Sequence, residues 1–185
     1  MGFDDPKRLA EAALYAHAVG ALARRSLTTA ELRARLARRA ANAEDVDVVV
    51  ARLAEIGYLD DARLADSYSR FRRDYEGLGK SRVLRELTRR GITPGVAGQA
   101  VAEAYEDTDE LELVREHLRR KLGGRSAGLP LDDPKRLASL YRALVRAGFP
   151  SAKIVIALQE ISSNSDWLEA FADQPDPAAD EGTYD

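Results

Sequence analysis

Cysteine is absent from this sequence, and His17 and His117 are its only histidines. The lack of cysteine excludes disulfide bonds, thiolate metal sites and cysteine nucleophiles, and it fits a reducing compartment. A zinc site would need both histidines together with carboxylates, yet the two lie in different parts of the chain. The Gly-x-Ser-x-Gly motif of serine hydrolases is also missing. We therefore expect no catalytic residue, no metal ion and no cofactor.

Long apolar runs are missing as well. No uninterrupted apolar stretch approaches the ~20 residues that a helix needs to cross a bilayer. Residues 1–5 carry no basic side chain, so they lack the charged start of a secretion signal. These absences predict a soluble, cytoplasmic protein without membrane contacts.

Charge is distributed unevenly along the chain. Seven acidic residues and no basic residue follow Ser165, whereas the preceding part carries 28 basic and 24 acidic side chains, a net charge of +4. The formal net charge of −3 therefore hides a basic body and an acidic tail. The tail at residues 166–185 is rich in proline and acid from Asp173 onward, which predicts disorder.

Helical signals dominate the rest of the sequence. Alanine, leucine, arginine and glutamate favour helices, and no segment shows the alternation typical of a strand. Nine helices are expected, at residues 5–24, 31–39, 44–56, 60–75, 80–90, 94–105, 109–122, 134–148 and 151–162. The expected apolar face of the first helix consists of Leu9, Ala12, Ala13, Ala16, Val19 and Ala23. In the fourth helix, Leu64, Tyr68 and Phe71 are expected to point into the core.

One pattern of apolar residues occurs three times with the same internal spacing. Leu36, Leu87 and Leu144 are equivalent and lie 51 and 57 residues apart. The other equivalent positions are Leu32, Val83 and Leu140; Val46, Ala97 and Ile154; Val50, Val101 and Leu158; and Leu53, Ala104 and Ile161. The pattern predicts an all-α tandem repeat of three three-helix modules, at residues 5–57, 58–107 and 108–165. Because each module is small, neighbours should share interfaces and form an elongated body.

Two pairs of acidic residues stand at predicted helix starts. Asp60 and Asp61 follow Gly57, which can take the left-handed conformation that closes a helix, and Asp132 and Asp133 precede a proline. Paired carboxylates are also metal ligands. At a helix start, however, they accept hydrogen bonds from unpaired N–H groups and offset the helix dipole. We therefore interpret both pairs as helix caps.

The segment Gly77-Leu78-Gly79-Lys80-Ser81 ends like a phosphate-binding loop of nucleotide hydrolases. That loop needs a further glycine five positions before its last one, where this sequence has Asp74, and it follows a strand rather than a helix. We therefore interpret the two glycines as helix breakers and predict no nucleotide hydrolysis.

Basic residues gather in two clusters. The first contains Arg24, Arg25, Arg33, Arg35, Arg38 and Arg39, and the second contains Arg63, Arg70, Arg72, Arg73, Lys80, Arg82, Arg85, Arg89 and Arg90. Guanidinium groups bind phosphates through paired hydrogen bonds, but a solvated helical surface has the same composition, so both interpretations stay open. Tyr68, Phe71 and Tyr75 lie within the second cluster. Exposed aromatic rings can stack on bases, although we expect core packing for Tyr68 and Phe71.

The second cluster also continues into a helix-turn-helix pattern around residues 89–94. The helix that would read DNA, at residues 95–103, has no positive charge and almost no base-reading side chains. Sequence-specific DNA binding is therefore not expected.

Several of these segments together resemble the signature of the RecX family of regulatory proteins. They are Gly57-Tyr58-Leu59-Asp60-Asp61-Ala62-Arg63-Leu64-Ala65, Gly79-Lys80-Ser81-Arg82-Val83-Leu84-Arg85-Glu86-Leu87, Arg89-Arg90-Gly91-Ile92 and, in the last module, Arg146-Ala147-Gly148-Phe149. The similarity is collinear from about Tyr15 to Ile161 and does not include the acidic tail. It implies tandem three-helix repeats, binding to RecA recombinase filaments on single-stranded DNA, and inhibition of their ATPase and strand-exchange activities.

Together these observations favour a non-enzymatic, monomeric regulator of the RecA filament. The residues expected to contact the filament or single- or double-stranded DNA are Arg70, Arg72, Arg73, Lys80, Arg82, Arg85, Arg89 and Arg90, followed by Arg33, Arg35, Arg38 and Arg39. Two alternatives stay open: a general nucleic-acid-binding protein without a recombinase partner, and a helical-repeat scaffold for another protein.

Overall fold

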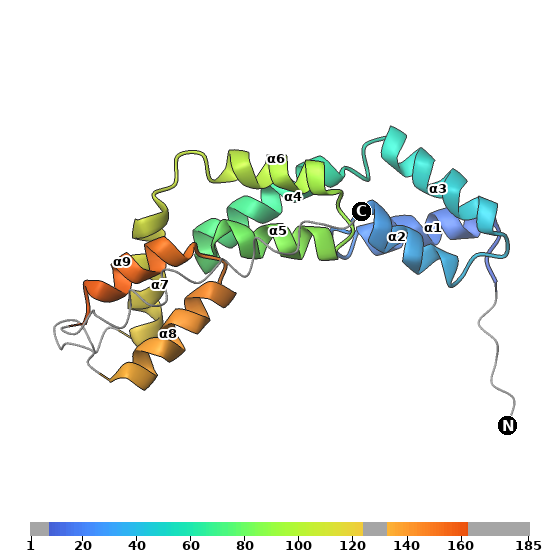
Figure 1. The fold of residues 1–185 in the computed structure, drawn as a ribbon. Coiled ribbons are helices and arrows are strands. Elements are labelled where there is room, and N and C mark those ends of the chain that lie inside the picture. Colours follow the sequence, from blue (N-terminus) through green and yellow to red (C-terminus); the bar gives the residue numbers. More distant parts are fainter. Residues whose placement is uncertain (1–7, 124–132, 163–185) are drawn as a thin grey trace, which may run out of the picture. The chain divides into compact units, whose positions relative to one another are not determined.

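The computed structural model describes residues 8–123 and 133–162, which form helices and no β-strand (Figure 1). The α-helices within them are α1 (Glu11–Leu22), α2 (Thr29–Ala37), α3 (Ala43–Glu55), α4 (Asp61–Phe71), α5 (Lys80–Arg89), α6 (Pro94–Ala104), α7 (Glu110–Leu122), α8 (Pro134–Arg146) and α9 (Ser151–Gln159). A π-helical turn, η1 (Arg72–Glu76), follows α4 directly. The predicted all-α fold is thus confirmed, while the predicted disorder of residues 166–185 lies outside the described residues. None of the described helices has both the length and the apolar character to span a membrane.

Contacts within the chain define two compact units. Unit 1 comprises Met1–Ser67 and Glu86–Ala100, and unit 2 comprises Tyr68–Arg85 and Val101–Asp185. The division falls inside α4, α5 and α6, so each of these helices contributes residues to both units. The module boundaries after residues 57, 107 and 165 stay a prediction.

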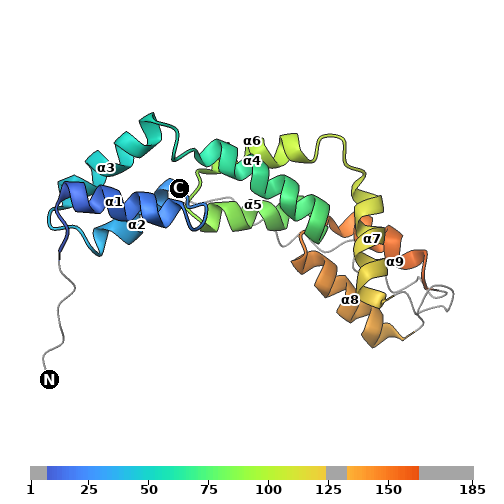
Figure 2. The same ribbon diagram turned by 180° about the vertical axis from the view of Figure 1, so that it is seen from behind.

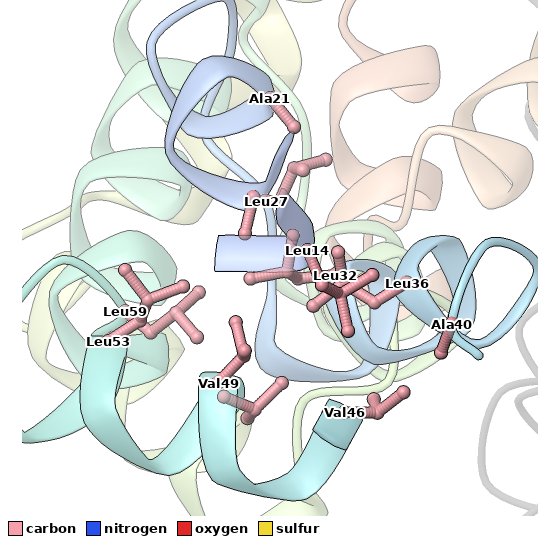
Figure 3. Packing of buried hydrophobic residues seen from close by; sticks show 12 residues of the cluster. Leu14, Ala21, Leu27, Leu32, Leu36, Ala40, Val46, Val49, Leu53 and Leu59 are labelled. Atoms are coloured by element: carbon pink, nitrogen blue, oxygen red, sulfur yellow. The ribbon is translucent and has the colours of Figure 1, made fainter. Parts of the chain in front are cut away.

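The core of unit 1 forms where α1, α2 and α3 pack against one another. Leu14, Leu32 and Leu36 point toward one another in Figure 3, and all three are fully buried. The same cluster contains Ala18, Ala21, Leu27, Ala40, Val46, Val49, Val50, Leu53 and Leu59. Each fully buried leucine contributes roughly 1.5–3 kcal/mol through removal of its apolar surface from water.

The apolar face predicted for the first helix is wrong for its four alanines, whereas Leu9 and Val19 are partly buried and pack against the core as expected. The buried residues of α1 are Leu14, Ala18 and Ala21, whereas Ala12, Ala13, Ala16 and Ala23 are exposed. Alanine occurs on every side of this helix, so the methyl groups alone do not select the face that packs. The helix also starts later than predicted, because Leu9 pairs with Ala40 in an isolated bridge. The Leu9 N–H donates to the Arg39 carbonyl, and the Leu9 carbonyl accepts from the Ala41 N–H.

Side chains cap the starts of two helices in unit 1. Thr28 accepts a hydrogen bond from the N–H of Glu31, and the Glu31 carboxylate accepts one from the N–H of Thr28, which forms a capping box for α2. Asp60 accepts from the N–H of Arg63 at 2.8 Å, and Asp61 accepts from the N–H of Thr29 at 2.9 Å. The interpretation as a helix cap is therefore confirmed for Asp60, whereas Asp61, the first residue of α4, accepts from the first residue of α2 instead of capping its own helix.

In unit 2, α9 packs against both α7 and α8, and the three helices lie together in both views (Figures 1 and 2). Asp109 caps α7 by accepting from the N–H groups of Leu111 and Glu112, and Asp133 caps α8, which opens with Pro134. Buried residues of these helices include Leu113, Val114, Leu118, Leu137, Leu140, Tyr141, Leu144, Ile154, Val155, Ala157 and Leu158. Asp132 lies outside the described residues.

The threefold apolar pattern coincides with the core. Leu36, Leu87 and Leu144 are fully buried in their respective helices. All the equivalent residues named above are buried as well, except Ile161, which is only partly buried. The repeated positions are therefore those that the fold buries. Their spacing is regular because they lie on the buried faces of the helices.

Candidate functional site

Two arginines of η1 in unit 2 are held by neighbouring groups. Arg72 pairs with Glu76 and donates to the Tyr68 hydroxyl at 2.7 Å, with its guanidinium 4.8 Å from the centre of the Tyr68 ring. Arg73 donates to both carboxylate oxygens of Asp74 and to the carbonyl of Ala104. The hydrogen bond from Arg73 holds the pKa of Asp74 below its ordinary value. These two side chains stabilise the end of α4 and its contact with α6.

Other basic residues of unit 2 lie on α4 and α5 and differ in exposure. Lys80 pairs with Glu110 at 3.1 Å, and Arg82 donates to the carbonyl of Arg146 at 3.3 Å. Arg70 is exposed, and Arg85 is partly buried. Within unit 2, Arg70 is thus the predicted site residue with the most accessible side chain.

Arg89 and Arg90 belong to unit 1 and have opposite environments. Arg89 is exposed at the end of α5. Arg90 is mostly buried and binds both oxygens of Glu31 and the carbonyl of Ser26. The Thr28 hydroxyl donates to the Arg90 carbonyl at 2.7 Å. Arg90 therefore joins the end of α5 to the start of α2.

The first basic cluster is brought together in part. Arg33 pairs with Asp47 of α3 at 3.0 Å. Arg35, Arg38 and Arg39, together with His17 of α1, line a cavity of about 290 Å³. Because positions i, i+3 and i+4 share one face of a helix, this gathering follows from the local geometry of α2 and its end.

The predicted core position of Phe71 is wrong. Its side chain is 49% exposed and stacks on Tyr75, which is 74% exposed, with ring centroids 5.0 Å apart. The buried residues of α4 are Ala65 and Ser69 instead. Phe71 stands two positions after Ser69, and side chains with that separation lie on different faces of a helix. Tyr68 and Leu64 are partly buried.

The glycine turn at residues 77–79 has a packing role. The N–H of Gly79 donates to the carbonyl of Ala147 at 2.8 Å, and the Tyr105 hydroxyl donates to the carbonyl of Leu78 at 2.7 Å. A Cβ atom at Gly79 would meet the backbone of Gly148 and would lie 2.8 Å from the nitrogen of Phe149. Glycine is therefore required for this close approach of two backbones, which agrees with the interpretation as a structural turn.

His117 contacts the same turn, a role that its place in the sequence does not signal. Its Nδ1 lies 3.0 Å from the carbonyl of Gly77, and its ring packs edge-on against Phe149 at 5.4 Å. Because a carbonyl oxygen only accepts, Nδ1 carries the proton in this hydrogen bond. Burial lowers the pKa of His117 below 6.5, and the charges of Arg120 and Lys121 act in the same direction. The ring is therefore neutral at pH values above 6.5.

The exposed cations of the predicted set offer binding to oxyanions rather than bond-breaking chemistry. Arg33, which pairs with Asp47, and Arg38, Arg39, Arg70 and Arg89 are exposed. Guanidinium groups bind phosphates and carboxylates through charge-assisted hydrogen bonds. The role of all twelve predicted residues in partner binding stays a prediction.

Comparisons with known proteins point to one family. A family profile described as "RecX, second three-helix domain" matches residues 60–101. A regulatory protein RecX of Amycolatopsis mediterranei is 30% identical over 139 residues, which cover 75% of this chain and 77% of the relative. A regulatory protein RecX of Pseudomonas putida strain GB-1 is 35% identical over 133 residues, covering 72% and 81% of the two chains.

The fold is similar to that of solved structures. The crystal structure of RecX from Lactobacillus salivarius superposes with a TM-score of 0.67 over 82% of this chain and 96% of that chain, at 20% sequence identity. At this identity the likeness concerns the fold.

Proposed function

Because the chain belongs to the RecX family of regulatory proteins, we propose that it binds the filament of RecA recombinase on single-stranded DNA and restrains its ATPase and strand-exchange activities. The observation that carries this proposal is the similarity to regulatory proteins over about three quarters of the chain. Regulation here means binding without catalysis, by a monomer that acts in the cytoplasm. The lack of cysteine is compatible with that compartment.

The proposed contacts are electrostatic and distributed over several helices. The exposed residues Arg38, Arg39, Arg70 and Arg89 are the first candidates, followed by the remaining predicted cations. Individual exposed ion pairs contribute little, roughly 0–1 kcal/mol each. Several such contacts on successive modules act together through effective concentration, so a protein of three modules can bind a polymeric filament firmly. Binding of this kind weakens as salt rises.

The test is a titration of the full-length protein into RecA, single-stranded DNA and ATP. We expect ATP hydrolysis and strand exchange to fall in a saturable way, and to recover as salt is raised. The double variant Arg70→Glu/Arg89→Glu should need an about tenfold higher concentration for half-inhibition. Arg142 is exposed on α8 and is outside the predicted set, so Arg142→Glu is the matched control.

Undiminished ATPase and strand exchange at saturating protein would refute the proposal. If the protein then still bound DNA in a salt-sensitive way, the alternative of a general nucleic-acid-binding protein would stand. The cavity lined by Arg35, Arg38, Arg39 and His17 favours that alternative as the second candidate.

A further inference from the structure

The cavity in unit 1 combines three guanidinium groups and one imidazole. Arg35 belongs to α2, Arg38 follows at its C-terminal cap, Arg39 comes next in the turn, and His17 is on the neighbouring helix α1. Since α1 and α2 pack together, both sides of the cavity are fixed by the core that contains Leu14, Leu32 and Leu36. His17 and Arg35 therefore line the cavity from packed helices, and Arg38 and Arg39 line it from the turn that ends α2.

Within residues 8–123 and 133–162, the charges that act on this cavity's imidazole are positive. Burial and the charges of Arg35, Arg39 and Arg24 lower the pKa of His17. Among the described residues, the charges that shift the pKa of this imidazole thus belong to arginines. The packing partner α3 contributes Asp47, which pairs with Arg33, and Arg52, which lies over the ring of Tyr15.

The Arg35 side chain has a buried hydrogen-bond donor that no described residue uses. The side chain lines the cavity, and its Nε is buried without a hydrogen-bond partner among the described residues. A buried donor without a partner costs roughly 1–3 kcal/mol, so a ligand that accepts a hydrogen bond there gains affinity. Arg38 and Arg39, which are exposed and also line the cavity, supply further donors.

From this arrangement we propose that the cavity binds a phosphate group of a single-stranded nucleic acid, with Arg35, Arg38 and Arg39 as donors. A phosphate group has oxygens that point in several directions, so different guanidinium groups can bind it at once. A carboxylate has two oxygens in one plane, so it is suited to two parallel hydrogen bonds with one guanidinium group. The volume of about 290 Å³ leaves room beside the phosphate for the attached sugar of a polynucleotide chain.

This inference depends on the proposed function in one respect: the phosphate group is taken to belong to a single-stranded nucleic acid. The site itself is tested without recombinase, so its failure and the failure of RecA regulation are distinguishable. Because the sequence has only two histidines, the imidazole resonances of His17 and His117 can be assigned with His117→Asn and followed by NMR in the full chain.

The experiment adds inorganic phosphate, a thymidine oligonucleotide or an oligoglutamate peptide to the full chain. We expect phosphate and the oligonucleotide to shift the His17 resonance saturably and to raise its pKa, while His117 in unit 2 stays unchanged. The variant Arg38→Ala/Arg39→Ala should bind the oligonucleotide about tenfold more weakly. Arg142→Ala, which removes an exposed arginine elsewhere, should bind as the unaltered protein does.

Three outcomes would overturn the inference. They are an unmoved His17 resonance, equal responses to oligoglutamate and the oligonucleotide, and a response to inorganic phosphate alone. The last result would place a free-anion site in the cavity instead of a nucleic-acid site. Unchanged circular dichroism and melting of the double variant ensure that lost binding reflects lost donors rather than unfolding.

Discussion

The guanidinium group of Arg90 forms two parallel hydrogen bonds with the carboxylate of Glu31, with Nε–Oε1 and Nη2–Oε2 distances of 2.9 and 3.0 Å. The same carboxylate completes the capping box of α2 by accepting from the N–H of Thr28. One ion pair thus stabilises a helix start and joins it to the end of α5. Arg90 thus has a structural role that does not depend on a binding partner.

Replacing Arg90 should destabilise the protein. Arg90→Ala leaves the mostly buried Glu31 carboxylate without its cation, which should lower the free energy of unfolding by about 1–3 kcal/mol. Chemical denaturation checks this value. The neighbouring Arg89 is exposed, so Arg89→Ala is the matched control and should change stability by less than about 0.5 kcal/mol.

The Arg90 effect should also depend on pH. Burial by itself would raise the pKa of Glu31, but the hydrogen bonds from Arg90 and Thr28 outweigh it, so the pKa is lowered from 4.5. A lowered carboxylate pKa stabilises the folded state above pH 4.5, and this stabilisation is lost as pH falls through the folded-state value. The gap between wild type and Arg90→Ala should therefore narrow below pH 4.5; a gap independent of pH would contradict the assignment.

Adding a methyl group at Gly79 should disturb unit 2. Gly79→Ala places a Cβ against the backbone of Gly148 and Phe149, which cannot move away as a flexible side chain can. We expect a loss of at least about 2 kcal/mol in unfolding free energy, measured by denaturation. Gly98 on α6 has open space around it, so Gly98→Ala should instead stabilise by up to about 1 kcal/mol. Equal effects of the two substitutions would argue against the close backbone contact.

His117 should make unit 2 sensitive to acid. Its pKa is lowered from 6.5, so between 6.5 and the folded-state value the unfolded chain binds more protons. Stability should consequently be complete above pH 6.5 and decline as pH falls below it. His117→Asn keeps an N–H donor near the Gly77 carbonyl but cannot titrate, so part of this decline should disappear in unfolding measurements across that range. His17→Asn is the comparison, because the pKa of His17 is lowered too.

Removing the Phe71 ring should have a small effect on stability. Phe71 is 49% exposed, so Phe71→Ala mainly loses its stacking with Tyr75, worth about 0.5–1.5 kcal/mol. Leu87 is fully buried, and Leu87→Ala should cost about 2–5 kcal/mol. Thermal melting of both variants checks the order. A larger loss for Phe71→Ala would restore the core role that periodicity predicted.

Periodicity succeeded where bulky and small or polar residues alternate clearly around the helix. Leu32, Leu36, Val46 and Leu53 are buried as expected, because each stands at the spacing of one helical face. Periodicity failed in α1, where alanine occurs on all sides, and at Phe71, where an aromatic residue stands opposite the buried Ser69. A hydrophobic residue can lie on either face, and only the neighbouring helices decide which face is covered.

For the candidate site, the sequence predicted only that arginines are abundant. It does not show which of them find carboxylates after folding. Arg90 meets Glu31 and Lys80 meets Glu110, residues that are far apart in the chain. Arg35, Arg38 and Arg39, by contrast, line one cavity with His17. Among the described residues, the charges that shift the pKa of His17 come from arginines.

The sequence by itself determined the helices, their caps and the threefold apolar pattern, because these depend on residues within a few positions of one another. Tertiary structure decided the rest. It placed Gly79 against Gly148, joined Arg90 to Glu31 and left Phe71 and Tyr75 exposed. Contacts of this kind depend on how distant segments pack, and local spacing carries no information about which distant group will be the partner.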